Sequence, residues 1–259
     1  MKKKKWLIIC ILLLIGCMLS GGYIIYYMKN QQRAEKEYEE ARKNAEEQTD
    51  ESDNAEKSED AGETKQVEIP IDFAALQKEN DEIYAWIKVP GTSVDYPIVQ
   101  SSTDDTFYVH KGIDKQYLYA GAIYTEMSNA KDFSDPNTVI YGHNMKSGSM
   151  FATLHNFRDR DFFDANREIL IYTPTHILHY TIFAAYTYDD RHILNCFDFS
   201  DKKEFQKYLD EIYELRSMDA YFLDEPKVTT EDKIITLSTC VGNDDSSRYL
   251  VQGVLTETE

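Results

Sequence analysis

An uninterrupted apolar segment opens the pattern of hydrophobic and polar positions. Residues 6–28 carry no charged side chain, and four lysines precede them. A run of this length exceeds the roughly 20 residues that a helix needs to cross a bilayer. We therefore predict a single-pass transmembrane anchor at 6–28 and a cytoplasmic N-terminus at 1–5. The lysine cluster favours this orientation, which places the rest of the chain outside the cell membrane, although basic residues also follow the segment.

Two other interpretations of the apolar segment remain open. It can be a cleaved signal peptide, or a lipoprotein signal, because Leu14-Ile15-Gly16-Cys17 loosely resembles a lipoprotein cleavage site. The apolar run continues through YIIYYM, beyond the usual core of a signal peptide. This continuation favours an anchor that stays in the membrane.

Charged residues dominate the next stretch, 29–66, where Tyr38 and scattered alanines supply the apolar content. Such a composition cannot bury enough apolar surface to offset the entropy lost on ordering. We predict a charged stalk at 29–66, helical in its first half and disordered in its second half. A folded domain at 67–259 follows the stalk.

The domain begins with an apolar pattern of helical spacing. Phe73, Leu76, Ile83 and Trp86 approximate one helical face, so we predict an N-terminal helical segment at 72–86.

Short segments rich in Val, Ile, Tyr and Thr come next, with turns between them. They predict a mostly β fold, a barrel or sandwich of mostly antiparallel strands with added helices. One short helix is expected at 150–157, and an amphipathic one at 201–218. The predicted strands are SVDYPIV, AGAIYTEM, NTVIYGHN, EILIYTP, HILHYTIFAAYTY, KIITLSTC and RYLVQGVL.

The net charge of −18 argues against nucleic acid as a partner, because binding it requires a basic surface. Cys10 and Cys17 lie in the apolar segment, so only Cys196 and Cys240 belong to the domain. These two can form one disulfide, or one of them is a working thiol and the other is buried filler.

Cys240 ends a strand-like run, and Arg248 lies on the next one. If the turn VGNDDSS reverses the chain, the two side chains face each other across an antiparallel pair. A cysteine nucleophile needs a nearby cation or base, and an arginine can stabilise an oxyanion. On its own, however, a cysteine at a strand end is more often a buried small residue.

His143 follows the strand NTVIYGHN, in a loop position typical of a general acid or base. His176 and His179 fall on opposite faces of a strand and cannot share a metal there. No convincing set of metal ligands is present, and we predict no metal and no cofactor. The remaining histidines, His110, His155 and His192, have no partner that the sequence identifies.

TLSTC, an arginine on the next strand and an upstream YGHN together resemble the sortases, membrane-anchored cysteine transpeptidases of Gram-positive bacteria. The stretch TVIYGHNMKSGSMFATLHNF and the helix before the cysteine strand resemble class B in particular. The resemblance covers the domain from about residue 67 to the end. It implies an eight-stranded β-barrel with added helices.

The resemblance also implies a catalytic triad of His143, Cys240 and Arg248. Ser238, Thr239 and Asn144 are then the expected substrate-binding residues. The implied partners are a secreted protein with a C-terminal sorting motif and an amine of a cell-wall precursor or a pilin. A catalytically inactive, membrane-tethered binding domain is the competing hypothesis, and a hydrolytic protease differs only in its acceptor.

Overall fold

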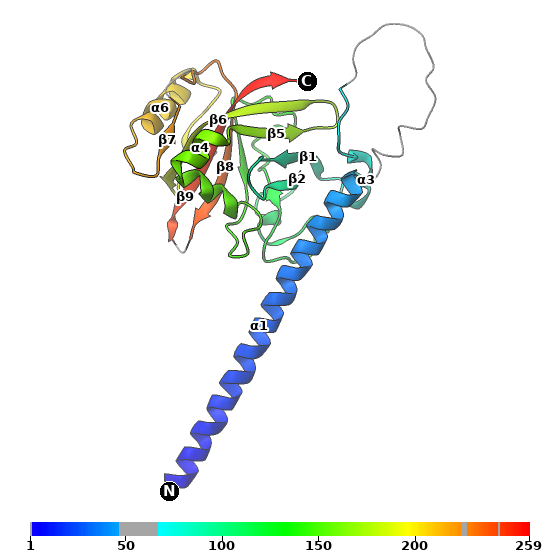
Figure 1. Cartoon of the computed structure of the whole chain (residues 1–259), viewed down its shortest axis with the longest axis vertical. Coiled ribbons are helices and arrows are strands. Elements are labelled where there is room, and N and C mark those ends of the chain that lie inside the picture. Colours follow the sequence, from blue (N-terminus) through cyan, green and yellow to red (C-terminus); the bar gives the residue numbers. More distant parts are fainter. Residues whose placement is uncertain (1, 47–66, 224–226, 243) are drawn as a thin grey trace.

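The structure, a computed structural model, describes residues 2–46, 67–223, 227–242 and 244–259. Its domain is built on a β-barrel from which one long N-terminal helix projects (Figure 1).

Eight strands close on themselves in the order β5-β1-β2-β3-β4-β8-β9-β6, with β6 pairing back to β5. The predicted barrel is therefore confirmed, and β7 joins β6 beside it. The pairs β2–β3 and β4–β8 are parallel, and the others are antiparallel. The strands are β1 Ile83–Lys88, β2 Asp95–Val99, β3 Ile123–Tyr124, β4 Asn137–Tyr141, β5 Glu168–Tyr172, β6 Ile177–Asp189, β7 Tyr221–Phe222, β8 Ile234–Val241 and β9 Asp244–Thr258.

All seven predicted β segments contain a strand, but the helix predicted at 72–86 is only half correct. Helix α3 spans Phe73–Glu79 and is capped by the Asp72 carboxylate, which accepts a hydrogen bond from the backbone N–H of Ala75. Ile83 and Trp86 lie on β1 instead. Five consecutive residues of β1 are buried, so this strand lacks the alternation that distinguishes a half-buried strand from a helix.

Both helices expected within the domain are present. The short one is the 3₁₀-helix η2, and the long one is α6, which ends at Tyr213, five residues before the predicted end. Phe205, Leu209 and Ile212 of α6 are buried in a cluster that includes residues of β6 and β9. The smaller helices are η1 Phe107–His110, η2 Ala152–Arg158, α4 Arg160–Ala165 and α5 Ile193–Cys196, and α6 itself spans Lys202–Tyr213.

Helix α1 runs unbroken from Lys2 to Glu46. It is the one helix in the described part of the chain that is long and apolar enough to cross a membrane. Its charged half does not stand free in solvent as a stalk, because one face of it is packed on the domain. Ala34, Tyr38, Ala41 and Ala45 are buried there, and they recur at helical spacing. The second half of the predicted stalk, 47–66, lies outside the described residues.

A buried polar network ties α6 to the strands of the barrel. The Tyr186 hydroxyl donates to Gln252 Oε1 at 2.8 Å, and Gln252 Nε2 donates to the hydroxyls of Tyr208 and Thr236, both at 2.7 Å. Thr236 in turn donates to Asn137 Oδ1 at 2.9 Å. Gln252 is fully buried, and its side chain joins β9 to β6, β8 and α6, while Thr236 extends the network to β4.

Candidate active site

Cys240 and Arg248 lie directly opposite each other in the β8–β9 hairpin. Side chains opposite each other in an antiparallel pair share a face and have Cβ atoms about 5 Å apart. The chain reverses more tightly than the predicted seven-residue turn, because Val241 already pairs with Asp244. The pairing places a fixed positive charge beside the thiol.

Strand β4 brings His143 to the same place. β4 runs parallel to β8 with Tyr141 beside Ser238, and the N–H of Gly142 donates to the carbonyl of Ser238 at 3.1 Å. A Cβ atom at Gly142 would lie 2.5 Å from Ile123 and 2.7 Å from Phe151. Only glycine lets the chain pass this closely before it presents His143.

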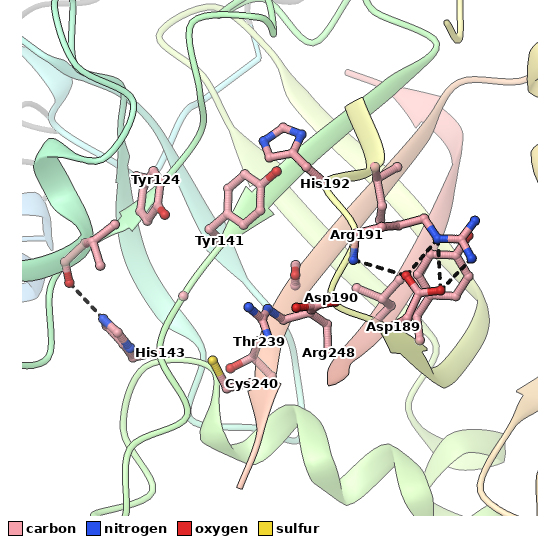
Figure 2. A pocket seen from close by; sticks show the side chains of 16 residues that line it. Tyr124, Tyr141, His143, Asp189, Asp190, Arg191, His192, Thr239, Cys240 and Arg248 are labelled. Carbon is pink, nitrogen blue, oxygen red and sulfur yellow. Dashed lines mark hydrogen bonds and ion pairs between the residues drawn. The ribbon is translucent and has the colours of Figure 1, made fainter. Parts of the chain in front are cut away.

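One pocket of about 280 Å³ is lined by His143, Cys240 and Arg248 together. In Figure 2 the sulfur of Cys240 lies between the ring of His143 and the guanidinium of Arg248. Ser238 and Thr239 also line the pocket. Of the predicted site residues, five of six therefore meet around this cavity.

The proton of His143 is fixed by its neighbours. Nε2 lies 2.8 Å from the carbonyl oxygen of Val109, and because a carbonyl only accepts, Nε2 carries a hydrogen. Nδ1 is then the nitrogen without a hydrogen in the neutral ring. Burial lowers the pKa of His143 below its usual value; the Val109 hydrogen bond opposes this, and the charge of His110 adds to it.

Two further rings stack near His143. The His110 ring lies 5.4 Å from it at an interplanar angle of 14°, and the Tyr119 ring lies 6.5 Å away at 11°. Tyr119 also stacks on His110 at 6.2 Å. The imidazole is thus held by one hydrogen bond and two nearly parallel rings.

Asn144 is bonded to the backbone of Cys240 and is not among the described residues that line the pocket. Its side-chain amide donates to the carbonyl of Cys240 at 3.0 Å. His155 Nε2 lies 3.1 Å from the same carbonyl and 3.0 Å from the Asn144 amide. The His155 ring packs on Tyr249 at 4.8 Å, and burial lowers the pKa of His155 and favours the neutral imidazole. The sequence had suggested substrate contact for Asn144 and had given no role to His155.

The comparisons with known proteins agree with this geometry. The family model described as "Sortase domain" matches residues 87–256. Sortase B of Listeria monocytogenes is 35% identical over 191 residues, which cover 73% of this chain and 75% of that protein. The chain belongs to the sortase family, class B. It is a cysteine transpeptidase of that class, as the resemblance of its TLSTC and YGHN segments implies.

Solved structures extend the likeness to the fold. Sortase B from B. anthracis is 30% identical, with a TM-score of 0.71 over 89% of this chain and 99% of that one. A Streptococcus pyogenes class B sortase involved in pilus biogenesis is 30% identical, with a TM-score of 0.60 over 71% of this chain and 97% of that one.

Arg191 and His192 also line the sortase pocket, and both side chains lie against carboxylates. Arg191 Nη2 lies 2.5 Å from the carboxylate of Asp189, and Arg191 Nη1 lies 3.0 Å from that of Glu211. His192 Nε2 contacts the Glu126 carboxylate at 2.7 Å. Asp189 and Arg191 are only two residues apart in the chain, whereas Glu211 reaches Arg191, and Glu126 reaches His192, only through the fold.

The cysteines of the sortase are free thiols, so the alternative of a Cys196–Cys240 disulfide is not realised. Cys196 is exposed at the end of α5, and Cys240 is half-buried. Among the residues that the structure describes, no cluster of three His, Cys, Asp or Glu side chains is arranged to hold a metal.

Proposed function

We propose that this sortase cleaves a C-terminal sorting motif of secreted proteins, with His143, Cys240 and Arg248 as its catalytic residues. The observation that carries the proposal is the single pocket that the three residues share, with Cys240 and Arg248 in cross-strand register. Ser238 and Thr239, which line this pocket, contact the substrate.

In the first half-reaction the Cys240 thiolate attacks the carbonyl carbon of the scissile peptide bond. Arg248 and neighbouring backbone amides stabilise the tetrahedral oxyanion. When the C–N bond breaks, the imidazolium of His143 gives its Nδ1 proton to the departing amine. The products are a thioester on Cys240 and the free C-terminal tail of the substrate.

In the second half-reaction an amine attacks the thioester. Neutral His143 takes the proton of the attacking amine, a new amide bond forms, and Cys240 leaves as the thiolate, so the enzyme returns to its starting state. The acceptor we favour is an amine of a cell-wall precursor. A pilin lysine is the second candidate, favoured by the likeness to the sortase involved in pilus biogenesis.

The apolar half of α1 fits a membrane anchor. We propose that 6–28 crosses the cell membrane once, with residues 1–5 in the cytoplasm and the catalytic domain outside. This location would place the pocket where secreted substrates and lipid-linked wall precursors both arrive.

The test uses the full chain in detergent micelles, a library of sorting-motif peptides and a free amine. Wild type should release the peptide tail and form an amide with the amine, and Cys240→Ala should lose at least about 10³-fold of this activity. Cys196→Ala is the matched control, since it removes an exposed thiol outside the pocket and should leave the rate unchanged.

The products separate the alternatives. Hydrolysed peptide in the presence of saturating amine would indicate a protease rather than a transpeptidase. Equal rates for wild type and Cys240→Ala, or a Cys240 that resists thiol reagents, would instead support an inactive binding domain.

A further inference from the structure

The segment that runs from the end of η1 toward β3 has one side that faces the active site. Its Val109 carbonyl accepts the hydrogen bond of His143, and its His110 and Tyr119 rings stack near the same imidazole. The contacts that fix the orientation of His143 thus come from one short segment, residues 109–119, which we call the stacking loop.

The other side of the stacking loop is bound to α1. The Tyr119 N–H donates to Asn30 Oδ1 at 2.9 Å, and the Tyr119 ring meets Tyr27 edge to face at 5.9 Å. Arg33 donates to the Tyr117 carbonyl at 3.1 Å and pairs with Asp114. The same residue, Tyr119, therefore contacts both the helix and the ring of His143.

Further along α1 the contacts continue at helical spacing. Glu37 accepts a hydrogen bond from the N–H of Asp114 at 3.2 Å, and the buried Tyr38 donates to the carbonyl of Gly121 at 2.5 Å. A Cβ atom at Gly112 would lie 2.3 Å from Glu37 Oε1, so a side chain there would displace the Glu37 carboxylate from its present position.

The stacking loop is internally tied, so its two sides move together. The N–H of Leu118 donates to the carbonyl of His110 at 3.0 Å, and the N–H of Gly112 donates to that of Gln116 at 3.0 Å; just outside the loop, the N–H of Ala122 donates to the carbonyl of Tyr108 at 3.0 Å. A displacement of the helix face is transmitted through these bonds to the rings and the carbonyl that hold His143.

We propose that the face of α1 from Asn30 to Tyr38 is a positioning element for His143, acting through the positioning residues His110 and Tyr119. The inference rests on the proposed catalytic role of His143. It makes the reactivity of the active site depend on the docking of the helix that emerges from the apolar segment. The titratable and charged groups around His143 are His110 and Tyr119 of the stacking loop, Cys240 of β8 and Arg248 of β9.

The first experiment compares two cation deletions on α1, each made in the full chain in detergent micelles. Arg33→Ala, combined with Asn30→Ala, removes contacts to the stacking loop. Lys36→Ala removes an exposed cation whose ion pair is with Glu40 of the same helix. We expect the Arg33 and Asn30 double variant to lower kcat by about tenfold, because small misplacements of a catalytic group are costly. Lys36→Ala should match wild type.

The pH profile distinguishes positioning from stability alone. Loosening the loop lets water reach His143, so its pKa should return toward about 6.5 and the acid limb of kcat/KM should move to higher pH. Tyr119→Ala should reproduce this shift, and Tyr119→Phe, which keeps the ring, should restore the wild-type profile.

A titration of the His143 imidazole by NMR, in the same variants, gives a readout that does not need catalysis. If the double variant and Tyr119→Ala melt at lower temperature but keep the wild-type pH profile and His143 titration, the contacts only stabilise the fold and the inference is overturned. If wild type shows no Cys240-dependent cleavage, the proposed function fails, and the NMR titration still decides whether α1 governs the environment of His143.

Discussion

The proposed mechanism requires His143 to be protonated in the first half-reaction, yet its surroundings favour the neutral ring. Burial is the largest influence and lowers its pKa, and the nearby His110 lowers it further. An ordinary cysteine pKa is about 8.5 and an ordinary histidine pKa about 6.5, so the thiolate–imidazolium pair is already a minority form in an unperturbed pair. The lowered pKa of His143 makes that form rarer, and the resting sortase holds mostly neutral imidazole at pH 7.

This balance predicts the acid side of the pH profile. The reactive form is the thiolate–imidazolium pair, which is the minority form. In that case kcat/KM rises with pH until the pH reaches the pKa of His143 in the free enzyme. The acid limb should therefore lie below pH 6.5, and a measured pH dependence of kcat/KM checks it.

His110→Phe keeps a ring in the stack and removes the nearby charge, so the acid limb should move to higher pH. The control is His176→Phe, which changes an exposed histidine that does not line the pocket and should shift nothing. An acid limb above pH 6.5 in wild type would contradict the lowered pKa.

A second residue-scale prediction concerns the carbonyl of Cys240, which Asn144 and His155 both contact. Because these contacts hold the end of β8, Asn144→Ala should lower kcat by about tenfold with little change in KM. Asn156→Ala is a matched amide deletion at an exposed position nearby and should be neutral. A change in KM alone would return Asn144 to the substrate-binding role that the sequence suggested.

At the scale of elements, the sequence predicts most of the strands of the barrel. It misses β1 and the contacts that join segments far apart in the chain. Segments rich in Val, Ile, Tyr and Thr identified seven of the strands, because turns separate these segments along the chain. β1 was taken for a helix, since the spacing of Ile83 and Trp86 from Phe73 suits a helix and both faces of the strand are buried. The proposed triad could be predicted from TLSTC, YGHN and a downstream arginine. The contacts of His155 and His110 with the site could not, because they join segments far apart in the chain.

The network around Gln252 gives a prediction at this scale. Gln252→Ala leaves the buried hydroxyls of Tyr186, Tyr208 and Thr236 without their amide partner and opens a small cavity. We expect the free energy of unfolding to fall by about 3 kcal/mol, measured by urea denaturation.

The matched control is Gln206→Ala on the exposed face of α6, where the lost hydrogen bond to Asp210 is solvated and the change should stay within about 0.5 kcal/mol. Equal destabilisation by the two substitutions would contradict a special role for the network.

For the whole molecule, the sequence separated an apolar segment, a charged segment and a domain, but treated the second as a spacer. The buried face of α1 was present in the sequence as Ala34, Tyr38, Ala41 and Ala45, spaced four, three and four residues apart. Small alanines among many charges carry little weight in a hydropathy pattern. Their contribution becomes visible only when the surface that they pack against is known.

The proposed location predicts which thiols are reachable from outside a Gram-positive cell. In a Cys240→Ala background, a membrane-impermeant maleimide should label the exposed Cys196 in intact cells, because the domain is outside. Cys196→Ser in the same background should abolish this labelling. Labelling that requires lysis would reverse the proposed orientation.

If 6–28 crosses the membrane as proposed, the docking of α1 also decides which part of the chain bears the mechanical load between membrane and domain. The carbonyl of Ala45 accepts a hydrogen bond from the N–H of Asp72 at 3.2 Å. The chain at Asp72 therefore lies beside the end of α1. With 6–28 in a bilayer, force on the domain passes directly into α1 and bypasses the segment 47–66. The height of the pocket above the lipid is then set by α1, at 1.5 Å of rise for each residue, and by the contacts that dock it on the domain. Shortening 47–66 would leave that height as it is.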